Sequence, residues 1–82
     1  MSRSRDVVEI VARALVDQPE LVSVSESEGR DGWFIEVTAA AGDLGKMIGR
    51  QGRTAGAVRA LATVAAESEG TCASVDFGDG HD

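Results

Sequence analysis

Apolar residues recur along this chain with two different periods, and each period predicts a different kind of element. The first repeat has the three- and four-residue spacing of an amphipathic helix, which begins near Asp6 and ends before Pro19. Its apolar members are Val7, Ile10, Val11, Ala14 and Leu15. We therefore expect a helix of about three turns that buries this side.

Three later segments alternate apolar and polar residues, as strands with one buried face do. The first contains Val22 and Val24, and the second runs from Trp33 to Ala39. Polar and turn-forming residues at 28–32 separate them, so we expect a hairpin. The third segment runs from Thr71 to Phe77. The residues expected on the buried faces are Val22, Val24, Trp33, Ile35, Val37, Ala39, Ala73, Val75 and Phe77.

Helical spacing returns in the second half of the chain, where two glycines divide it. Gly42 and Asp43 predict a turn in which Asp43 is the N-cap of a short helix over residues 44–48. Gly49 ends this helix, and a longer helix begins after Gly52. The residues expected on the core side of the longer helix are Thr54, Val58, Leu61, Ala62 and Ala65. The predicted order is therefore helix, strand, strand, short helix, Gly-x-x-Gly loop, helix, strand.

The length of 82 residues is enough for one small domain with a single core. We expect this domain over residues 6–77, between a flexible N-terminal leader at 1–5 and a flexible tail at 78–82. The single cysteine, Cys72, excludes an internal disulfide, and no apolar run reaches the roughly 18 residues of a membrane span. These features predict a cytoplasmic protein without membrane contact.

The positive charge of the chain is concentrated in one segment. Residues 44–66 hold four of the eight basic residues and no acidic residue, whereas the rest of the chain holds all 14 acidic residues. The segment therefore carries +4 and the remainder −10, for a net charge of −6. This separation predicts an anion-binding site with a short footprint, because the acidic surroundings repel a longer polyanion. The four basic residues are Lys46, Arg50, Arg53 and Arg59.

The two glycines of this segment leave room for a phosphate backbone. Gly49 and Gly52 lack the side chains that would keep a sugar-phosphate chain away, and Arg50 and Gln51 between them can point outward. Arg53 adds charge to the first turn of a helix whose N-terminus attracts anions. The glycine spacing fits neither the P-loop nor the dinucleotide-binding motif, so we expect no nucleotide cofactor.

No set of residues for catalysis or for metal binding can be assembled from the sequence. The only histidine, His81, lies near the C-terminus beside Asp79 and Asp82, without a supporting shell or a nucleophile. We therefore expect a protein that is not an enzyme and that holds no metal and no cofactor.

The stretch Ile48-Gly49-Arg50-Gln51-Gly52, followed by a helix with Val58 and Leu61, resembles the Ile-Gly-x-x-Gly signature of the KH domain. The helix and strand before the β-α-α-β core resemble the type II arrangement, and the segment 43–54 together with the small size resembles the bacterial KhpA family. The resemblance implies an α+β type II KH fold of order α-β-β-α-α-β. In this fold three helices pack on one side of a three-stranded sheet, and the GxxG loop joins the second and third helices.

The same resemblance implies a single-stranded RNA-binding protein that clamps about four nucleotides at the loop. It also implies an RNA chaperone or post-transcriptional regulator with a link to cell-envelope growth and cell shape. The implied partner is a second copy, or a KhpB (Jag or EloR) type protein in a heterodimer. The implied RNA-binding residues are Lys46, Ile48, Gly49, Arg50, Gln51, Gly52, Arg53 and Arg59.

Two alternatives stay open at the level of sequence. One is a KH-shaped scaffold whose acidic face binds a protein, and the other is a single-stranded DNA binder, since nothing identifies a 2′-hydroxyl contact. Gly56 stands where the family more often has a bulky aliphatic residue, which predicts a close backbone approach or a wider groove. Ala57, Ala60 and Val64 form a row of small apolar residues that offers a candidate dimer contact.

Overall fold

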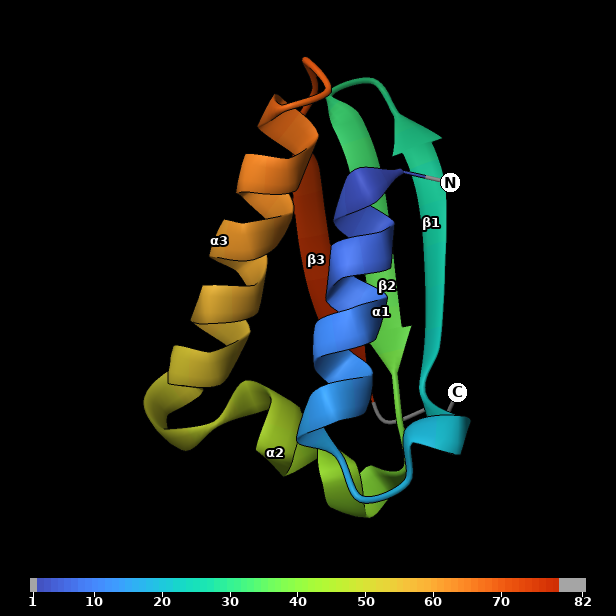
Figure 1. Ribbon diagram of the computed structural model, residues 1–82, viewed down its shortest axis with the longest axis vertical. Coiled ribbons are helices and arrows are strands. Elements are labelled where there is room, and N and C mark those ends of the chain that lie inside the picture. The colour runs from blue at the N-terminus through green and yellow to red at the C-terminus, as the bar shows by residue number, and fades with distance from the viewer. Residues whose placement is uncertain (1, 79–82) are drawn as a thin grey trace.

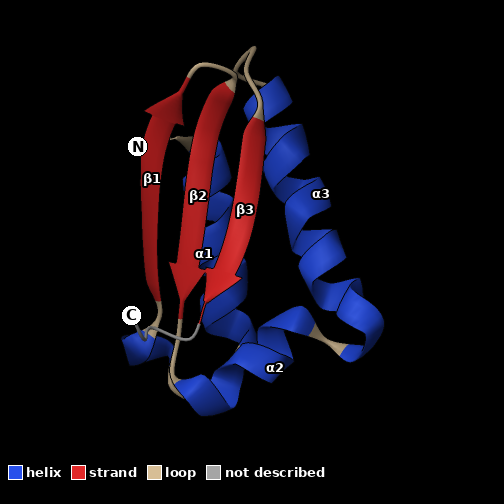
Figure 2. Ribbon diagram, turned by 180° about the vertical axis from the view of Figure 1, so that it is seen from behind, coloured by secondary structure: helices blue, strands red, loops and turns tan. Residues whose placement is uncertain are grey.

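The computed structural model describes residues 2–78, which form a three-stranded sheet with its helices on one side (Figure 1). The strands are β1 (Ser23–Gly29), β2 (Gly32–Thr38) and β3 (Ala73–Gly78). The helices are α1 (Arg3–Leu15), α2 (Leu44–Ile48) and α3 (Arg53–Glu67). Short 3-10 helices cover Pro19–Leu21, Ala41–Asp43 and Arg50–Gly52. Seen from behind in Figure 2, the opposite face of the sheet is not covered by any of the described helices.

The sheet has the order β1-β2-β3 and contains both kinds of strand pairing. β1 pairs antiparallel with β2 through a hairpin, and β2 pairs parallel with β3. The parallel pair requires a crossover connection, which α2 and α3 supply. The element order and the placement of the helices confirm the α+β type II KH fold that the sequence predicted.

The core lies between the sheet and the helices. Ile35 and Val37 of the central strand are fully buried, and so are Val8 of α1 and Met47 of α2. The buried faces predicted for the strands are correct, since Val24, Ile35, Val37 and Val75 all point into this core. The loop that contains Gly49 and Gly52 lies at one end of the molecule, outside this core (Figure 1).

The first helix begins at Arg3 and not near Asp6, so the prediction of a flexible leader at residues 1–5 is wrong for residues 3–5. The Ser2 side chain caps α1 by accepting a hydrogen bond from the Arg5 backbone N–H at 3.1 Å. Its backbone N–H in turn donates to the Glu26 carboxylate on β1. The helix start was missed because the prediction relied on the spacing of apolar residues, whereas polar contacts fix this end of α1. Gly78 ends β3, and the rest of the predicted tail lies outside the described residues.

Three residues predicted to face the core are exposed, namely Ile10, Ala14 and Leu61. Ile10 of α1 is 69% exposed and Leu61 of α3 is 48% exposed. Ala12 of α1 and Ala55 and Ala66 of α3 are buried instead. The apolar side of each helix is wider than the strip that packs inward, so the spacing alone does not determine which apolar residues are buried.

The hairpin is longer than expected. β1 pairs with β2 as far as Gly29 opposite Gly32, so the turn contains only Arg30 and Asp31.

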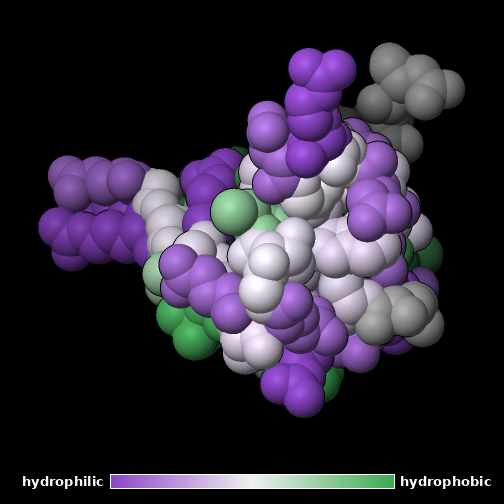
Figure 3. Space-filling view, turned by 90° about the horizontal axis from the view of Figure 1, so that it is seen from above, coloured by the Kyte–Doolittle hydropathy of each residue, from purple (hydrophilic) through white to green (hydrophobic). Residues whose placement is uncertain are grey.

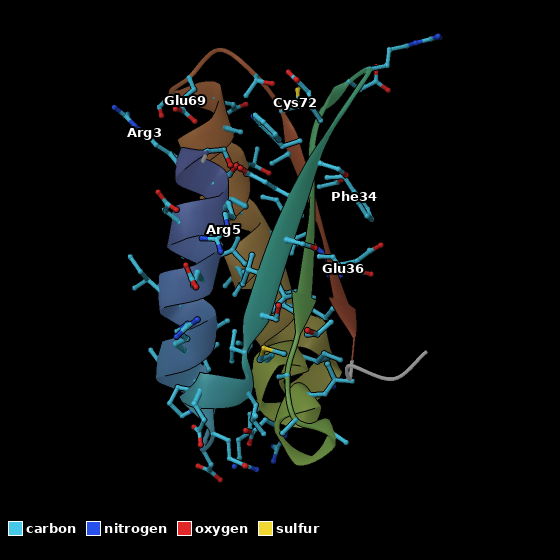
Figure 4. The ribbon with its side chains drawn as sticks, turned by 90° about the vertical axis from the view of Figure 1, so that its right-hand side faces the viewer. Arg3, Arg5, Phe34, Glu36, Glu69 and Cys72 are labelled. Carbon is cyan, nitrogen blue, oxygen red and sulfur yellow. The ribbon has the colours of Figure 1, made fainter. Side chains whose placement is uncertain are left out.

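Figure 4 shows Phe34 and Glu36 pointing away from the helices on the uncovered face of the sheet. The end of the molecule that includes this turn is mainly hydrophilic (Figure 3). Among residues 2–78, no helix is both long and apolar enough to cross a membrane.

Candidate nucleic-acid interface

The loop between α2 and α3 is a tight turn that both glycines shape. α2 ends because Gly49 adopts φ 76° and ψ 172°, a combination that is essentially restricted to glycine. The Gly49 N–H still donates to the Gly45 carbonyl at 2.8 Å, which closes the last turn of α2. Gly52, with φ 74°, then precedes the first residue of α3.

The two glycines have different reasons to lack a side chain. A Cβ on Gly49 would overlap the Thr54 side chain, which lies against the loop from the first turn of α3. A Cβ on Gly52 would meet no atom within 4 Å. Gly49 is therefore required by the packing of the loop itself, whereas the space beside Gly52 is open to a ligand.

The residues around Gly52 form a positively charged and accessible surface. Arg50, Gln51 and Arg53 are all exposed. Gln51 has a positive φ of 57°, and it is the only described residue other than glycine that does. Its side-chain oxygen accepts a hydrogen bond from the Arg53 guanidinium at 3.2 Å. Within residues 2–78, neither Arg50 nor Arg53 lies within 4.0 Å of a carboxylate.

The N-terminus of α3 opens toward the same surface without a cap. Gly52 supplies no side-chain hydrogen bond, and the first turn of α3 contains no acidic residue. The first N–H groups of this 15-residue helix therefore have no side-chain acceptor at this end, and its dipole favours an anion there.

Lys46 does not join this surface. Its ammonium group forms ion pairs with Asp17 and, at 3.6 Å, with Asp43. The hydrogen bond to Asp17 raises the pKa of Lys46 above its ordinary value. Binding of a phosphate by Lys46 would therefore have to compete with two carboxylates of the chain itself.

Asp43 has a structural role that the sequence did not reveal. Its buried carboxylate accepts hydrogen bonds from the backbone N–H groups of Asp17 and Gln18, at 3.3 and 3.0 Å. It makes no side-chain cap on α2, so the predicted N-cap contact is absent. The carboxylate instead joins the start of α2 to the segment after α1.

Two further predicted residues lie on opposite sides of the loop in the sequence, one in α2 and one in α3. Ile48 is 36% exposed at the end of α2, beside Gly49, so it lies at the surface and not in the core. Arg59 lies further along α3, where its Nε donates to the Val75 carbonyl of β3 at 3.1 Å. Its guanidinium also covers the Phe77 ring, 5.3 Å from the ring centroid.

Gly56 does not fit the first explanation that the sequence suggested, a close approach by another part of the described backbone. The position is exposed, and a Cβ added there would meet no atom within 4 Å. No backbone therefore approaches it closely. It lies on the surface of α3 between Gly52 and Arg59, where the absence of a side chain leaves the helix backbone accessible.

Other concave surfaces are at the far end of the molecule. An open hollow of about 420 Å³ is lined by residues 29–34 and 72–74, and includes the exposed Cys72. A second hollow of about 370 Å³ is lined by Ser2, Glu28, Trp33, Glu69 and Thr71. In the described part of the chain, no three His, Cys, Asp or Glu residues are grouped so that they could hold a metal ion.

Comparison with known proteins identifies the family. The family model for the KhpA/KhpB KH domain matches residues 5–77. The chain is 45% identical to "RNA-binding protein KhpA" of Caldanaerobacter subterraneus subsp. tengcongensis over 64 residues, which are 78% of this chain and 85% of that protein. It is 43% identical to the protein of the same name in Clostridium perfringens over 65 residues, which are 79% of this chain and 87% of that protein.

A more distant relative covers still more of the chain. The protein named RNA-binding protein KhpA in Chlamydia trachomatis is 35% identical over 73 residues, which are 89% of this chain and 94% of the relative. No solved structure gives a significant match. Since the family model and the relatives span most of the chain and include the GxxG loop, this chain belongs to the KhpA/KhpB family of KH-domain proteins.

Proposed function

We propose that this protein binds single-stranded RNA at the surface formed by the GxxG loop and the N-terminus of α3. The observation that carries the proposal is the juxtaposition of an uncapped helix N-terminus with Arg50 and Arg53, neither of which has a carboxylate partner among the described residues. The relatives support the proposal, because they are named RNA-binding protein KhpA.

In this mechanism the protein contacts the RNA backbone first. The open side of Gly52 admits a phosphate to the free N–H groups of α3, and Arg50 and Arg53 neutralise its charge. Gln51 extends outward from the turn, and exposed Ile48 offers an apolar contact for a base or sugar. The acidic remainder of the chain limits the footprint to about four nucleotides, the length that one GxxG loop clamps.

The proposal includes a wider role at the level of the family. We infer an RNA chaperone or a post-transcriptional regulator in the cytoplasm, with an effect on cell-envelope growth. Lys46 contributes only if an incoming phosphate displaces Asp17 and Asp43, so we assign it a smaller part than Arg50 and Arg53.

The partner surface that we propose is the exposed face of α3. Ala57, Ala60, Leu61 and Val64 are all exposed, and Val64 is 64% exposed. An apolar side of a helix is normally covered by another element or by a partner. A second copy, or a KhpB-type protein, would cover this face and would place two loops in one assembly, which raises avidity for RNA.

The proposed site is tested by changing Arg50 and Gln51 to Asp together. Aspartate tolerates the positive φ at position 51, so the variant should keep its fold while it repels phosphate. A control with the same change in charge converts Ser27 and Arg30, both exposed and at the hairpin end, to Asp. We expect crosslinking to single-stranded RNA to fall more than tenfold for the loop variant and to change little for the control.

The rival functions give different results in the same experiment. If the loop variant retains full RNA crosslinking, the loop is not the RNA site and the proposal fails. A scaffold would keep its protein partner and show no RNA binding even in the wild type. Equal binding of RNA and DNA of the same sequence would identify a single-strand binder without 2′-hydroxyl recognition.

A further inference from the structure

Each edge strand of the sheet has a backbone carbonyl that an arginine from a neighbouring helix covers. Arg5 of α1 donates to the Val24 carbonyl of β1 at 3.1 Å, and Arg59 of α3 donates to the Val75 carbonyl of β3 at the same distance. β1 and β3 are the outer strands, so each has one side without a strand partner. The two arginines thus satisfy equivalent acceptors on opposite edges and hinder unwanted strand pairing there.

The two arginines differ in their counter-charges. Arg5 lies 2.7 Å from a Glu9 carboxylate oxygen and 3.5 Å from Asp6, and its side chain is only 14% exposed. The hydrogen bond from Arg5 lowers the pKa of Glu9, as expected for a carboxylate that is held in the ionised form. The charge of Arg5 is therefore balanced within the chain.

Arg59, unlike Arg5, has no acidic partner among the described residues. Within residues 2–78, no carboxylate lies within 4.0 Å of its guanidinium. Its contacts are a neutral carbonyl and the neutral Phe77 ring, and only its Nε is engaged in a hydrogen bond with the described residues. A guanidinium has five N–H donors, so most of the donors of Arg59 remain available to an anion.

The position of Arg59 places these donors in line with the proposed RNA site. Gly52, Gly56 and Arg59 are four and three residues apart, so they share one side of α3. Arg59 lies about 10 Å from Gly52 along the helix axis, at 1.5 Å per residue. Because Gly56 has no side chain and the space beside it is free among the described residues, the helix surface between the loop and Arg59 is uncovered at this position. A sugar-phosphate chain can therefore reach the helix surface between the loop and Arg59.

We propose that Arg59 exchanges partners when RNA binds. In the free protein it covers the Val75 carbonyl and the Phe77 ring. In the complex its guanidinium turns to a phosphate of the strand that enters at the loop, and the edge of β3 becomes accessible to a base. The exchange is favourable because hydrogen bonds between ionised partners are roughly twice as strong as neutral ones. This inference rests on the proposed function.

The test compares how RNA affinity depends on salt in three variants, with a short unstructured single-stranded RNA as the probe. Three or four neutralised phosphates give the wild type a slope of about −2 to −3 in log K against log salt. Arg59→Gln should remove about 0.7 from that slope and weaken binding about fivefold at 0.1 M salt. Arg59→Lys should restore most of the slope. Arg13→Gln removes the same charge from an exposed position on α1 and should leave the slope unchanged.

A second measurement follows Arg59 directly and does not depend on a variant. The NMR signal of its side-chain Nε–H should shift when RNA is added, because this proton leaves the Val75 carbonyl. The Nε–H signal of Arg5 should stay in place. If Arg59→Gln keeps the wild-type slope, or the Arg59 signal does not move, the exchange does not occur even when the loop variant has lost RNA binding. If the loop variant binds RNA normally, the proposed site and the exchange both fail.

Discussion

At the scale of single residues, the loop shows that one motif contains two kinds of glycine. The sequence predicted that both Gly49 and Gly52 make room for a phosphate backbone. The structure assigns Gly49 to the fold, since it has a glycine-only backbone conformation and contacts Thr54. Only Gly52 has open space beside it. The motif shows that both positions are glycine, but only the folded structure shows that Thr54 packs against Gly49 and that no side chain packs against Gly52 among the described residues.

Gly49→Ala should therefore lower stability directly. A residue forced into this backbone region costs about 1–3 kcal/mol, and the new methyl group also collides with Thr54. Urea unfolding followed by circular dichroism should show a lower midpoint. Gly56→Ala is the matched control, since it adds a methyl group to an exposed helical site with free space, and should raise stability by about 0.4–1 kcal/mol. Equal stabilities for Gly49→Ala and the wild type would contradict the role given to Gly49.

Charge composition predicted which segment is basic, but not which basic side chains are available. Lys46 belongs to the positive segment in sequence, yet it pairs with Asp17, which is 29 residues earlier. The family resemblance implied Arg59 as an RNA contact, and its contacts with Val75 and Phe77 could not be foreseen. Such pairs depend on how α1, α2 and β3 meet in space, and a local pattern holds no information about them.

At the scale of elements, the type and order of the α-helices and strands were predicted from the sequence, whereas the three short 3-10 helices and the buried side of the α-helices were not. The strands have one polar and one apolar side, so their faces were predicted correctly. α3 has apolar residues on its outer side as well as on its buried side, and the buried positions are mostly small ones that allow α3 to pack against α1. Its outer side then presents Leu61 and Val64 to solvent.

This outer side of α3 makes a prediction about assembly. If it is the contact with a second copy, Val64→Lys should convert the dimer to a monomer, because a buried ammonium without a partner is costly. Ile10→Lys makes the same change at the 69% exposed position on α1 and should leave the assembly intact. Sedimentation velocity measures both. A wild type that is monomeric at micromolar concentrations, or equal effects of the two substitutions, would place the contact elsewhere.

At the scale of the whole molecule, the fold places opposite charges in different regions. The GxxG loop, α3 and the edge of β3 carry Arg50, Arg53 and Arg59, while Glu36 and Asp76 lie on the uncovered face of the sheet. We therefore expect an RNA strand to be attracted to the loop side and repelled by the open sheet face. The sequence predicted a short basic site with acidic surroundings, and we propose that this site continues along α3 toward β3, where Arg59 lies.

The most direct test is to map RNA contacts by NMR on the isotope-labelled protein, with a short unstructured single-stranded RNA. We expect the largest amide shifts at residues 49–54, with further shifts at Arg59 and Val75. The signals of Ser25, Phe34 and Ser74 on the open sheet face should remain unchanged. Shifts confined to that face, with the loop signals unmoved, would contradict binding at the GxxG loop.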